Sequence, residues 1–270
     1  MTKYLYETHM HTHQGSACAR SRGADYIKPY IDFGYAGIII TDHFYKGNTR
    51  PDRSLPWKEW VNQFCSGYED AKNEGNKHNF PVFFGIEENF NGDEYLIYGI
   101  TKEWLLEHPD IRQWSRSRLA DEVHTFGGCI VQAHPFRSRS YNDAIHLLPD
   151  YVDGIEAVNY GNVPVWNTLA LQYAKRLKLP YSSGSDNHDA ASMREENLGG
   201  ILLDRPLNSI QDYVSVILNK EHMEIKTPSA EILPPWQLDL PIDLPVHIHG
   251  KENTLLSGDV RKLLEKGQLV

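Results

Sequence analysis

Short apolar runs that alternate with helical patterns constrain the fold of this chain more than any other feature. Residues 37–40 (GIII) and 129–131 (CIV) are apolar and rich in β-branched side chains, without the alternation of a half-exposed strand. Strands of this kind, each linked to the next by a helix, indicate a parallel sheet covered on both faces. In 270 residues, this pattern predicts either a (β/α) barrel or a doubly wound sheet.

We expect eight strands, most of them joined by helices, along the first 205 residues. The expected strands cover residues 3–9, 37–43, 81–90, 94–100, 128–135, 154–161, 179–186 and 199–204. The expected helices include residues 24–34, 57–78, 110–127 and 165–178.

Polar groups directly follow several of these apolar strands. They are TDH (41–43), GIEEN (85–89), AHPFR (133–137) and GSDNH (184–188). A barrel brings all such strand ends around one mouth, whereas a doubly wound sheet gathers those at its switch point. The pattern therefore favours the barrel. The sequence contains no Gly-rich phosphate loop of the GxGxxG or GxxxxGK[ST] type.

Three histidines, His9, His11 and His13, alternate at the end of the first expected strand. Residues i and i+2 of a strand point to the same face, so His9 and His11 direct their imidazoles into one space. His13 is followed by Gln-Gly, which favours a loop position, although a continued strand would make it a further ligand.

Imidazole and carboxylate groups dominate the strand ends. The set comprises His9, His11, Asp42, His43, Glu87, Glu88, His134, Asp186 and His188. These ligand types suit Zn, Mn or Fe better than Ca or Mg alone, and their number exceeds what one four-coordinate ion needs. Two or three ions that share a carboxylate are the economical interpretation.

Five motifs in this order resemble the polymerase and histidinol phosphatase (PHP) superfamily. They are HMHT (9–12), TDH (41–43), GIE (85–87), AHP (133–135) and SDNH (185–188), and the resemblance spans roughly residues 4–205. It implies a distorted (β/α)7 TIM-like barrel, the PHP fold, with two or three divalent ions (Zn, Mn or Fe) and phosphoesterase activity.

The resemblance also assigns roles to individual residues. The first ion would be held by His9, His11, Glu87 and Asp186. Glu87 would bridge to a second ion, which His134 also binds, and a third ion would take His43 and His188. The same resemblance implies that Glu87, Asp186 and His188 take part in catalysis.

Two positions depart from the family pattern. Members often supply a second-ion histidine after the glutamate, whereas this chain has residues 91–95 (NGDEY), so either Glu94 or Tyr95 substitutes or the second site is weaker. Members also supply an Asp or His to the third ion shortly after HxHT, where this chain offers His13, Ser16 and Cys18. Cys18 is either a packed side chain or a soft ligand.

Other titratable residues have simpler interpretations. Asp42 is either a ligand or, as we favour, a residue that fixes an imidazole tautomer, and Glu88 points away from Glu87 in a strand. His247 and His249 repeat the HxH spacing but are expected to be exposed strand residues. We expect surface positions in helices or at helix ends for His78, His108, His124, His146 and His222.

Two arginines are candidates for a substrate phosphate, which binds well to a guanidinium fork. Arg137 follows His134 by three residues at the same mouth, and Arg20 follows Cys18. The alternative for Arg137 is a surface salt bridge.

Charge and cysteine content exclude several classes of protein. The formal charge is −9, with 27 basic and 36 acidic residues, which argues against a nucleic-acid partner. Three widely separated cysteines do not form a disulfide framework. No apolar run approaches the length of a membrane span, and residues 1–9 lack a signal-peptide core, so we expect a cytoplasmic protein without a membrane partner.

Residues 1–228 are expected to form the barrel domain, and residues 229–270 a Pro-rich extension packed on it that ends in a short helix. The expected function is hydrolysis of a small phosphomonoester, histidinol-phosphatase-like, through a metal-bridging hydroxide. The alternatives are a 3′–5′ exonuclease or oligonucleotide phosphodiesterase of the PHP type, or a non-catalytic metal-binding module. The sequence does not select the substrate, the ion or the oligomeric state.

Overall fold

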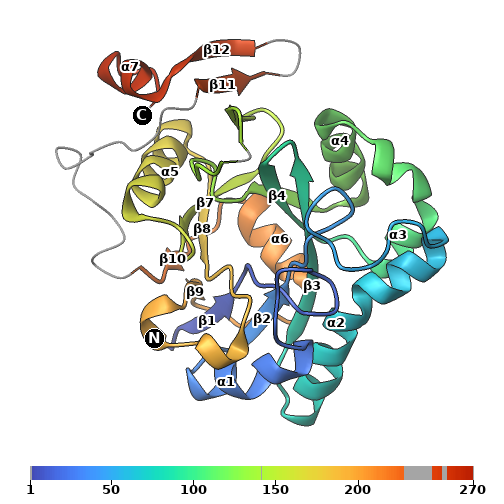
Figure 1. Cartoon of the computed structure of the whole chain (residues 1–270). Helices are drawn as coiled ribbons and strands as arrows, with labels where there is room; N and C mark the ends of the chain where they lie inside the picture. The colour runs from blue at the N-terminus through green and yellow to red at the C-terminus, as the bar shows by residue number, and fades with distance from the viewer. Residues whose placement is uncertain (1, 141, 228–244, 251–253, 270) are drawn as a thin grey trace.

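A computed structural model of the chain describes residues 2–140, 142–227, 245–250 and 254–269. Residues 228–244, which include the start of the predicted Pro-rich extension (229–270), lie outside the described residues. Figure 1 shows helices arranged around a curled sheet, with the last strands and helix at one end of the molecule. Within the described ranges, no helix is both long and apolar enough to cross a membrane.

The main sheet has nine strands in the order β10-β9-β1-β2-β3-β4-β5-β7-β8. Their bounds are β1 Tyr4–Glu7, β2 Gly37–Ile40, β3 Val82–Phe90, β4 Asp93–Tyr98, β5 Cys129–Gln132, β7 Gly154–Asn159, β8 Tyr181–Gly184, β9 Ile201–Leu203 and β10 Glu224–Ile225. All eight strands expected from the sequence are therefore present. A second sheet has the order β12-β11-β6, with β6 Ile145–Leu147, β11 Pro245–His249 and β12 Thr254–Asp259.

Figure 1 shows most helices around the curled sheet, whereas the helix that carries Tyr213 lies within the ring of strands, where Tyr213 belongs to the same core as Leu96 and Val131. The helices are α1 Ile27–Asp32, α2 Trp57–Lys77, α3 Lys102–Glu107, α4 Arg116–Phe126, α5 Pro164–Leu177, α6 Ile210–Leu218 and α7 Val260–Glu265, with 3₁₀ turns at Gly23–Tyr26, Pro109–Gln113, Ala190–Ser192 and Glu195–Asn197. The single helix predicted for residues 110–127 is wrong. Ser115 divides it, because its side chain accepts the Arg118 N–H and caps a new helix.

The sheet is mixed, which corrects the expectation of a purely parallel one. β4 runs antiparallel to β3 and β5, and β9 runs antiparallel to β1. The reversal after β3 comes from a two-residue turn at Asn91 and Gly92, with φ of 58° and 98°. An Asn-Gly pair readily adopts the two positive φ values that a tight hairpin requires. This hairpin places Glu94 on the same face as Glu87.

The sheet curls into a nearly closed barrel, so the predicted distorted α/β barrel is confirmed. The segments that follow β1 and β8 meet at the mouth. The Asp186 N–H donates to the His9 carbonyl at 2.8 Å, and the His11 N–H donates to the Asn187 carbonyl at 2.9 Å. These backbone bonds hold the two strand ends side by side.

Gly67 lets helix α2 approach the loop that carries His11. A Cβ atom at this buried position would lie 1.9 Å from the Thr12 Oγ1 and 3.2 Å from an Asp42 carboxylate oxygen. Glycine within a helix costs about 1 kcal/mol relative to alanine. The close contact with the loop explains why the helix has glycine here.

We expect the Gly67→Ala variant to be less stable by about 1–3 kcal/mol, because the clash exceeds the gain in helix propensity. Urea unfolding of the variant and the wild type measures the difference. Gln63→Ala, an exposed change in the same helix, is the control and should stay within about 0.5 kcal/mol. A Gly67→Ala protein as stable as the wild type would contradict the proposed packing.

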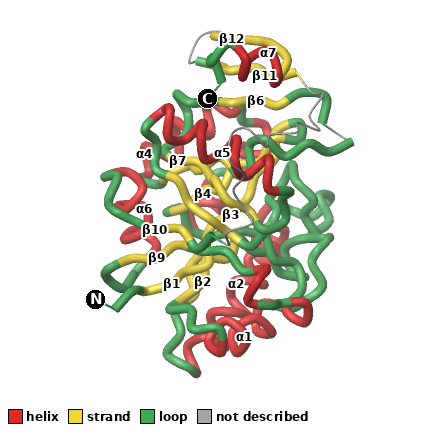
Figure 2. Tube along the Cα trace, turned by 90° about the vertical axis from the view of Figure 1, so that its left-hand side faces the viewer, coloured by secondary structure: helices red, strands yellow, loops and turns green. Residues whose placement is uncertain are grey.

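The described part of the C-terminal region forms a small ribbon, β11 and β12 followed by α7. Strand β11 pairs in parallel with β6, and Figure 2 shows the two strands side by side. Val246, Val260 and Leu263 of this region belong to the largest hydrophobic core. The surface position expected for His146 is wrong, because this residue is half-buried in β6. His247 and His249 lie in a strand as expected, but they are also half-buried.

Candidate metal centre

Five strands deliver imidazole and carboxylate groups to one buried space. His9 and His11 follow β1, His43 follows β2, Glu87 lies on β3, His134 follows β5, and Asp186 and His188 follow β8. His9, His11, His43, Glu87 and His134 are buried, whereas the side chains of Asp186 and His188 are 8% and 30% exposed. Among the described residues, four groups of three have their ligand atoms mutually within 4.8 Å. They are His9/His11/Asp186, His9/Glu87/His134, His43/Glu87/Glu94 and His11/His43/His188.

Hydrogen bonds fix the tautomers of two of these histidines. The Nδ1 of His9 lies 2.8 Å from the Glu156 Oε1, a carboxylate that can only accept while it is ionised. His9 Nδ1 therefore donates, and its Nε2 carries a lone pair toward the other ligands. This is the arrangement of a metal-binding imidazole that a carboxylate orients.

The second tautomer follows from Asp42 and Ser16. The Ser16 hydroxyl donates to the Asp42 carboxylate at 2.7 Å, so its oxygen accepts from His11 Nδ1 at 3.1 Å. The Asp42 carboxylate also accepts the Thr12 N–H and hydroxyl, both at 2.6 Å. Asp42 is absent from the groups of candidate ligands. It acts through Ser16, in line with the tautomer-fixing role that we favoured from the sequence.

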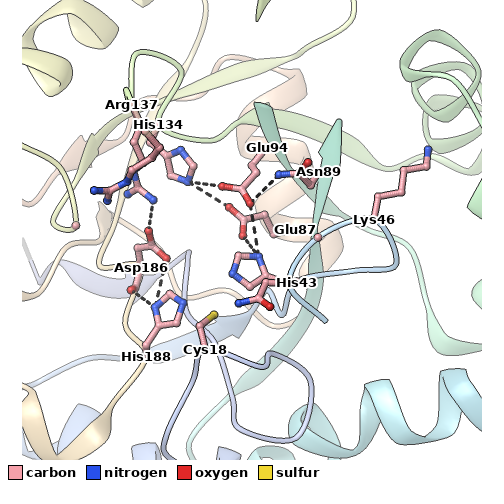
Figure 3. Close-up of a pocket in the computed structure, with 14 residues that line it drawn as sticks. Cys18, His43, Lys46, Glu87, Asn89, Glu94, His134, Arg137, Asp186 and His188 are labelled. Carbon is pink, nitrogen blue, oxygen red and sulfur yellow. Dashed lines mark hydrogen bonds and ion pairs between the residues drawn. The ribbon is translucent and has the colours of Figure 1, made fainter. Parts of the chain in front are cut away.

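The two oxygens of Glu87 face different groups. Oε1 lies 3.2 Å from the His9 Nε2 and 3.3 Å from the His134 Nε2, whereas Oε2 lies 2.7 Å from the His43 Nδ1. Figure 3 shows this carboxylate between His134 and His43. A carboxylate placed in this way can bridge two cations.

The donor set also fits a cation because two of its buried atoms have no hydrogen-bond partner. Among the described residues these include His43 Nδ1 and Glu87 Oε2, which approach each other without hydrogen-bond geometry. Buried polar atoms are nearly always paired. A cation between imidazole and carboxylate ligands would satisfy both atoms.

Glu94, considered from the sequence as a substitute for the second-ion histidine, lies close to two of the candidate ligands. Its Oε1 lies 3.7 Å from the His43 Nδ1, and its Oε2 lies 3.5 Å from the His134 Nε2. The β3–β4 hairpin causes this, since Glu94 is directly opposite Asn89 on the face that also carries Glu87. Tyr95, the other substitute considered from the sequence, alternates to the opposite face.

The charges of the centre compensate one another. Burial would raise the pKa of Glu87, but the rings of His9 and His43 hold it well below its usual range. Burial would likewise lower the pKa of His9, yet Glu156 and Glu87 raise it well above the ordinary value. The carboxylates around these rings therefore favour positive charge, which a bound cation would supply.

Two of the candidate ligands have unusual backbone conformations. The φ angles of His134 and Asp186 are 27° and 53°, in a region that non-glycine residues rarely adopt. Both residues follow buried strands and turn their side chains into the centre. Backbone strain of this kind clusters at functional sites.

Solved structures similar to this one share its architecture. A two-domain protein from Bacteroides vulgatus ATCC 8482, described as containing a predicted PHP-like metal-dependent phosphoesterase, matches with a TM-score of 0.64 and 15% identity. The match covers 83% of this chain and 65% of that chain, so this chain spans less than two thirds of that protein. No protein-family model and no curated protein matches the sequence.

The chain has a PHP-like fold. A structure from Bifidobacterium adolescentis ATCC 15703, named as a candidate metal-dependent phosphoesterase, matches with a TM-score of 0.50 and 15% identity over 78% of this chain and 96% of that one. The lesion-specific endonuclease PfuEndoQ from Pyrococcus furiosus matches with a TM-score of 0.52 and 13% identity over 83% of this chain and 58% of that one. At such identities, the likeness concerns the fold.

The centre of this PHP-like barrel opens into a cavity of about 580 Å³. His43, Glu87, Glu94, His134, Asp186 and His188 form part of its wall, together with Lys46, Asn89, Arg137 and Arg139. His9 and His11 lie beneath them and are fully buried. The cavity therefore gives a solute access to the groups around Glu87.

Cys18 lies on the cavity wall, and His13 does not. Burial would raise the pKa of the Cys18 thiol, but hydrogen bonds with His188 and His43 lower it to about 6. His13 is exposed in a loop, and its Nδ1 lies 3.2 Å from the Ala19 carbonyl oxygen. It belongs to none of the ligand groups found among the described residues.

The two arginines considered as phosphate ligands have different positions. Arg137 lines the cavity, but its guanidinium is already bound. Its NH1 lies 2.8 Å from the Asp186 Oδ2, while its Nε and NH2 donate to the side chains of Asn162 and Asn159. Figure 3 shows Arg137 turned toward Asp186. Arg20 is exposed and is not among the described residues that line the cavity.

Sequence reasoning missed Glu156, which orients three parts of the centre. Besides His9, this fully buried carboxylate accepts the His134 N–H at 3.1 Å and the Asn159 side-chain N–H at 2.9 Å. The signal was present, since a glutamate in the middle of the apolar strand at residues 154–159 needs a partner when buried. Lys46, Asn89 and Arg139 were also missed, because each lies in a loop or hairpin whose position depends on the fold.

Proposed function

We propose that this chain is a metal-dependent phosphoesterase that hydrolyses a small phosphomonoester. The observation that carries the proposal is the Glu87 carboxylate, whose oxygens face two histidine groups at the floor of an open cavity. Divalent cations at such a site act as Lewis acids on a phosphoryl group and make water acidic enough to supply hydroxide near pH 7.

Residues of the chain would bind the cations and position their ligands. His9, His11, Glu87 and Asp186 would hold one cation, and Glu87, Glu94, His134 and His43 offer ligands for a second. Glu156 and Ser16 keep the metal-facing nitrogens of His9 and His11 free of protons, as derived above from their hydrogen bonds. Arg137 holds the Asp186 carboxylate in place.

The size and charge of the cavity support a small anionic substrate. A volume of about 580 Å³ accommodates a phosphomonoester with a compact organic group. Arg139 contributes positive charge on its wall, whereas the Lys46 side chain extends away from the candidate ligands and its ammonium donates to the Trp114 carbonyl. The net charge of −9 disfavours a long nucleic acid, which would extend beyond the cavity over the acidic surface.

Protein purified without a chelator should contain at least two ions per chain and should hydrolyse phosphomonoesters. We suggest elemental analysis combined with a panel of p-nitrophenyl phosphate, histidinol phosphate, mononucleotides and a single-stranded oligonucleotide. Cleavage of the oligonucleotide alone would favour the nuclease alternative. Metal without any turnover on the panel would favour a non-catalytic metal-binding module.

We expect Arg139→Ala to lower kcat/KM about tenfold, mainly through KM, with unchanged metal content. The Arg139 guanidinium lies over the Trp166 ring at 5.6 Å and has no ion-pair partner among the described residues, so it can meet a substrate phosphate. Steady-state kinetics with metals counted in parallel measure the effect. Arg20→Ala, outside the described cavity wall, is the comparison. A larger loss with Arg20→Ala would reverse the assignment.

A further inference from the structure

Asn159, the last residue of strand β7, is a fully buried amide with partners on both sides. Its Oδ1 accepts the Arg137 NH2 at 2.6 Å and the Gly161 backbone N–H at 2.8 Å. Its Nδ2 donates to the Glu156 Oε2 at 2.9 Å. One side chain therefore joins a guanidinium to a fully buried carboxylate.

The orientation of the Asn159 amide follows from these partners. A guanidinium and a backbone N–H can only donate, so the amide oxygen faces Arg137 and Gly161. The ionised Glu156 carboxylate can only accept, so the amide nitrogen faces Glu156. A carboxamide carries the acceptor and the donor on two separate atoms, whereas aspartate, which has the same shape, offers acceptors alone.

Helix α5 holds the backbone of Asn159 in place. The fully buried Asn167 of α5 accepts the Asn159 backbone N–H at 3.1 Å and donates to the Asn159 carbonyl at 3.2 Å. Both backbone groups are thus bound, as they would be by a neighbouring strand. The Asn167 Oδ1 also accepts the Asn162 side-chain N–H at 2.9 Å. The position of the Asn159 side chain is therefore fixed from its backbone.

Each partner of the Asn159 side chain contacts one candidate metal ligand. Glu156 uses its other oxygen, Oε1, to bind the His9 Nδ1 at 2.8 Å. The Arg137 NH1 lies 2.8 Å from the Asp186 Oδ2. His9 and Asp186 belong to the same group of three candidate ligands. Asn159 itself is not among the described residues that line the cavity, so any effect on a bound ion passes through Glu156 and Arg137.

We propose that Asn159 is a positioning residue for the cation assigned to His9 and Asp186, which it fixes through Glu156 and Arg137. The proposal rests on the metal centre of the proposed function. Both ligands must be in place for one ion to bind, and a single amide bound to both orienting residues sets them together. Without this amide, the opposite charges of Glu156 and Arg137 would attract each other across the buried space, and each would be free to turn away from its ligand.

The test compares three full-length variants with the wild type. Asn159→Asp keeps the shape and the acceptor for Arg137 but places a second carboxylate against Glu156. Asn159→Ala removes both side-chain partners without adding a charge, so it decides the question if Asn159→Asp does not fold. Asn73→Asp, an exposed change in helix α2 that alters the net charge equally, is the control.

Competition with a chelator should show metal affinity about 10- to 100-fold weaker in both Asn159 variants, the usual loss when a residue that orients a metal ligand is removed. At saturating Co²⁺, the visible absorption bands of the bound ion should also change, because they depend on the ligand geometry. Asn73→Asp should match the wild type in both measurements. Wild-type affinity and unchanged cobalt bands in a folded Asn159 variant would overturn the proposal, whatever its free energy of unfolding.

Neither measurement needs turnover, so the test separates this proposal from the proposed function. If the wild type binds metal but hydrolyses no phosphomonoester, metal affinity and the cobalt bands still decide the role of Asn159. In an active enzyme, kcat at saturating metal should fall about tenfold while KM stays within about twofold. A higher KM with wild-type metal affinity would show instead that Asn159 acts on the substrate, against the proposal.

Discussion

Glu87→Gln is expected to lose at least one bound ion per chain and to hydrolyse phosphomonoesters at least about a hundredfold more slowly than the wild type. The substitution keeps the shape of the side chain and removes its negative charge. Two cations near one another repel, and the Glu87 oxygens face both candidate sites. Neutral glutamine offers one oxygen in place of two and cannot balance the charge of the pair.

Glu88→Gln is the matched control. Glu88 is the next residue of β3 and is as buried as Glu87, but its side chain points to the other face and accepts the N–H groups of Lys46 and Asn89. The amide oxygen of glutamine can accept the same bonds, so metal content and turnover should stay near wild type. Elemental analysis and p-nitrophenyl phosphate kinetics on both variants check the prediction. Wild-type turnover by Glu87→Gln would refute the bridging role.

Arg137→Ala is expected to weaken metal binding about 10- to 100-fold, which is the usual effect of removing a residue that orients a metal ligand. The Arg137 guanidinium forms an ion pair with Asp186 and donates hydrogen bonds to Asn162 and Asn159. Burial would raise the pKa of Asp186, but Arg137 and His9 hold it well below its usual range. Loss of Arg137 frees Asp186 from its fixed position and leaves a buried carboxylate without its strongest partner.

Arg137→Lys refines the test, because lysine keeps the charge but cannot form three directed bonds at once. Competition with a chelator measures the metal affinity of both variants, and kinetics at saturating metal measure KM. The role proposed from the sequence, a direct phosphate contact, predicts the opposite result. If metal affinity stays at the wild-type value while KM rises, Arg137 binds the substrate rather than Asp186.

The elements of the barrel could be predicted from the sequence because their signals are local. Residues 37–40 and 129–131 are apolar on both faces, and such a run is typical of a strand inside a covered sheet. The direction of β4 could also have been inferred, since Asn91-Gly92 is a strong hairpin signal. The break at Ser115 and the short strand β6 were missed, because a capping serine and a three-residue strand with a histidine at its centre are weak signals on their own.

The histidines and acids of the centre could likewise be listed from the sequence, since each follows a predicted strand. The hydrogen bonds and ion pairs that these residues form with one another could not be predicted. Glu156 lies within a predicted strand and orients His9 directly. Asp42 lies at the end of another predicted strand and acts on His11 through Ser16. Hydrogen-bond geometry depends on distances of a few tenths of an ångström between segments far apart in the chain.

The sequence by itself determined which strand ends carry metal-binding groups, because alternation, apolar runs and turn residues act over a few neighbouring positions. The tertiary structure alone decided that Arg137 holds Asp186, that Glu94 joins Glu87 across a hairpin, and that His146 meets His247 and His249. The physical reason is that charge, burial and metal binding depend on which side chains share a small volume. The packing of the whole chain brings these side chains together, and their separation along the sequence does not predict which of them meet.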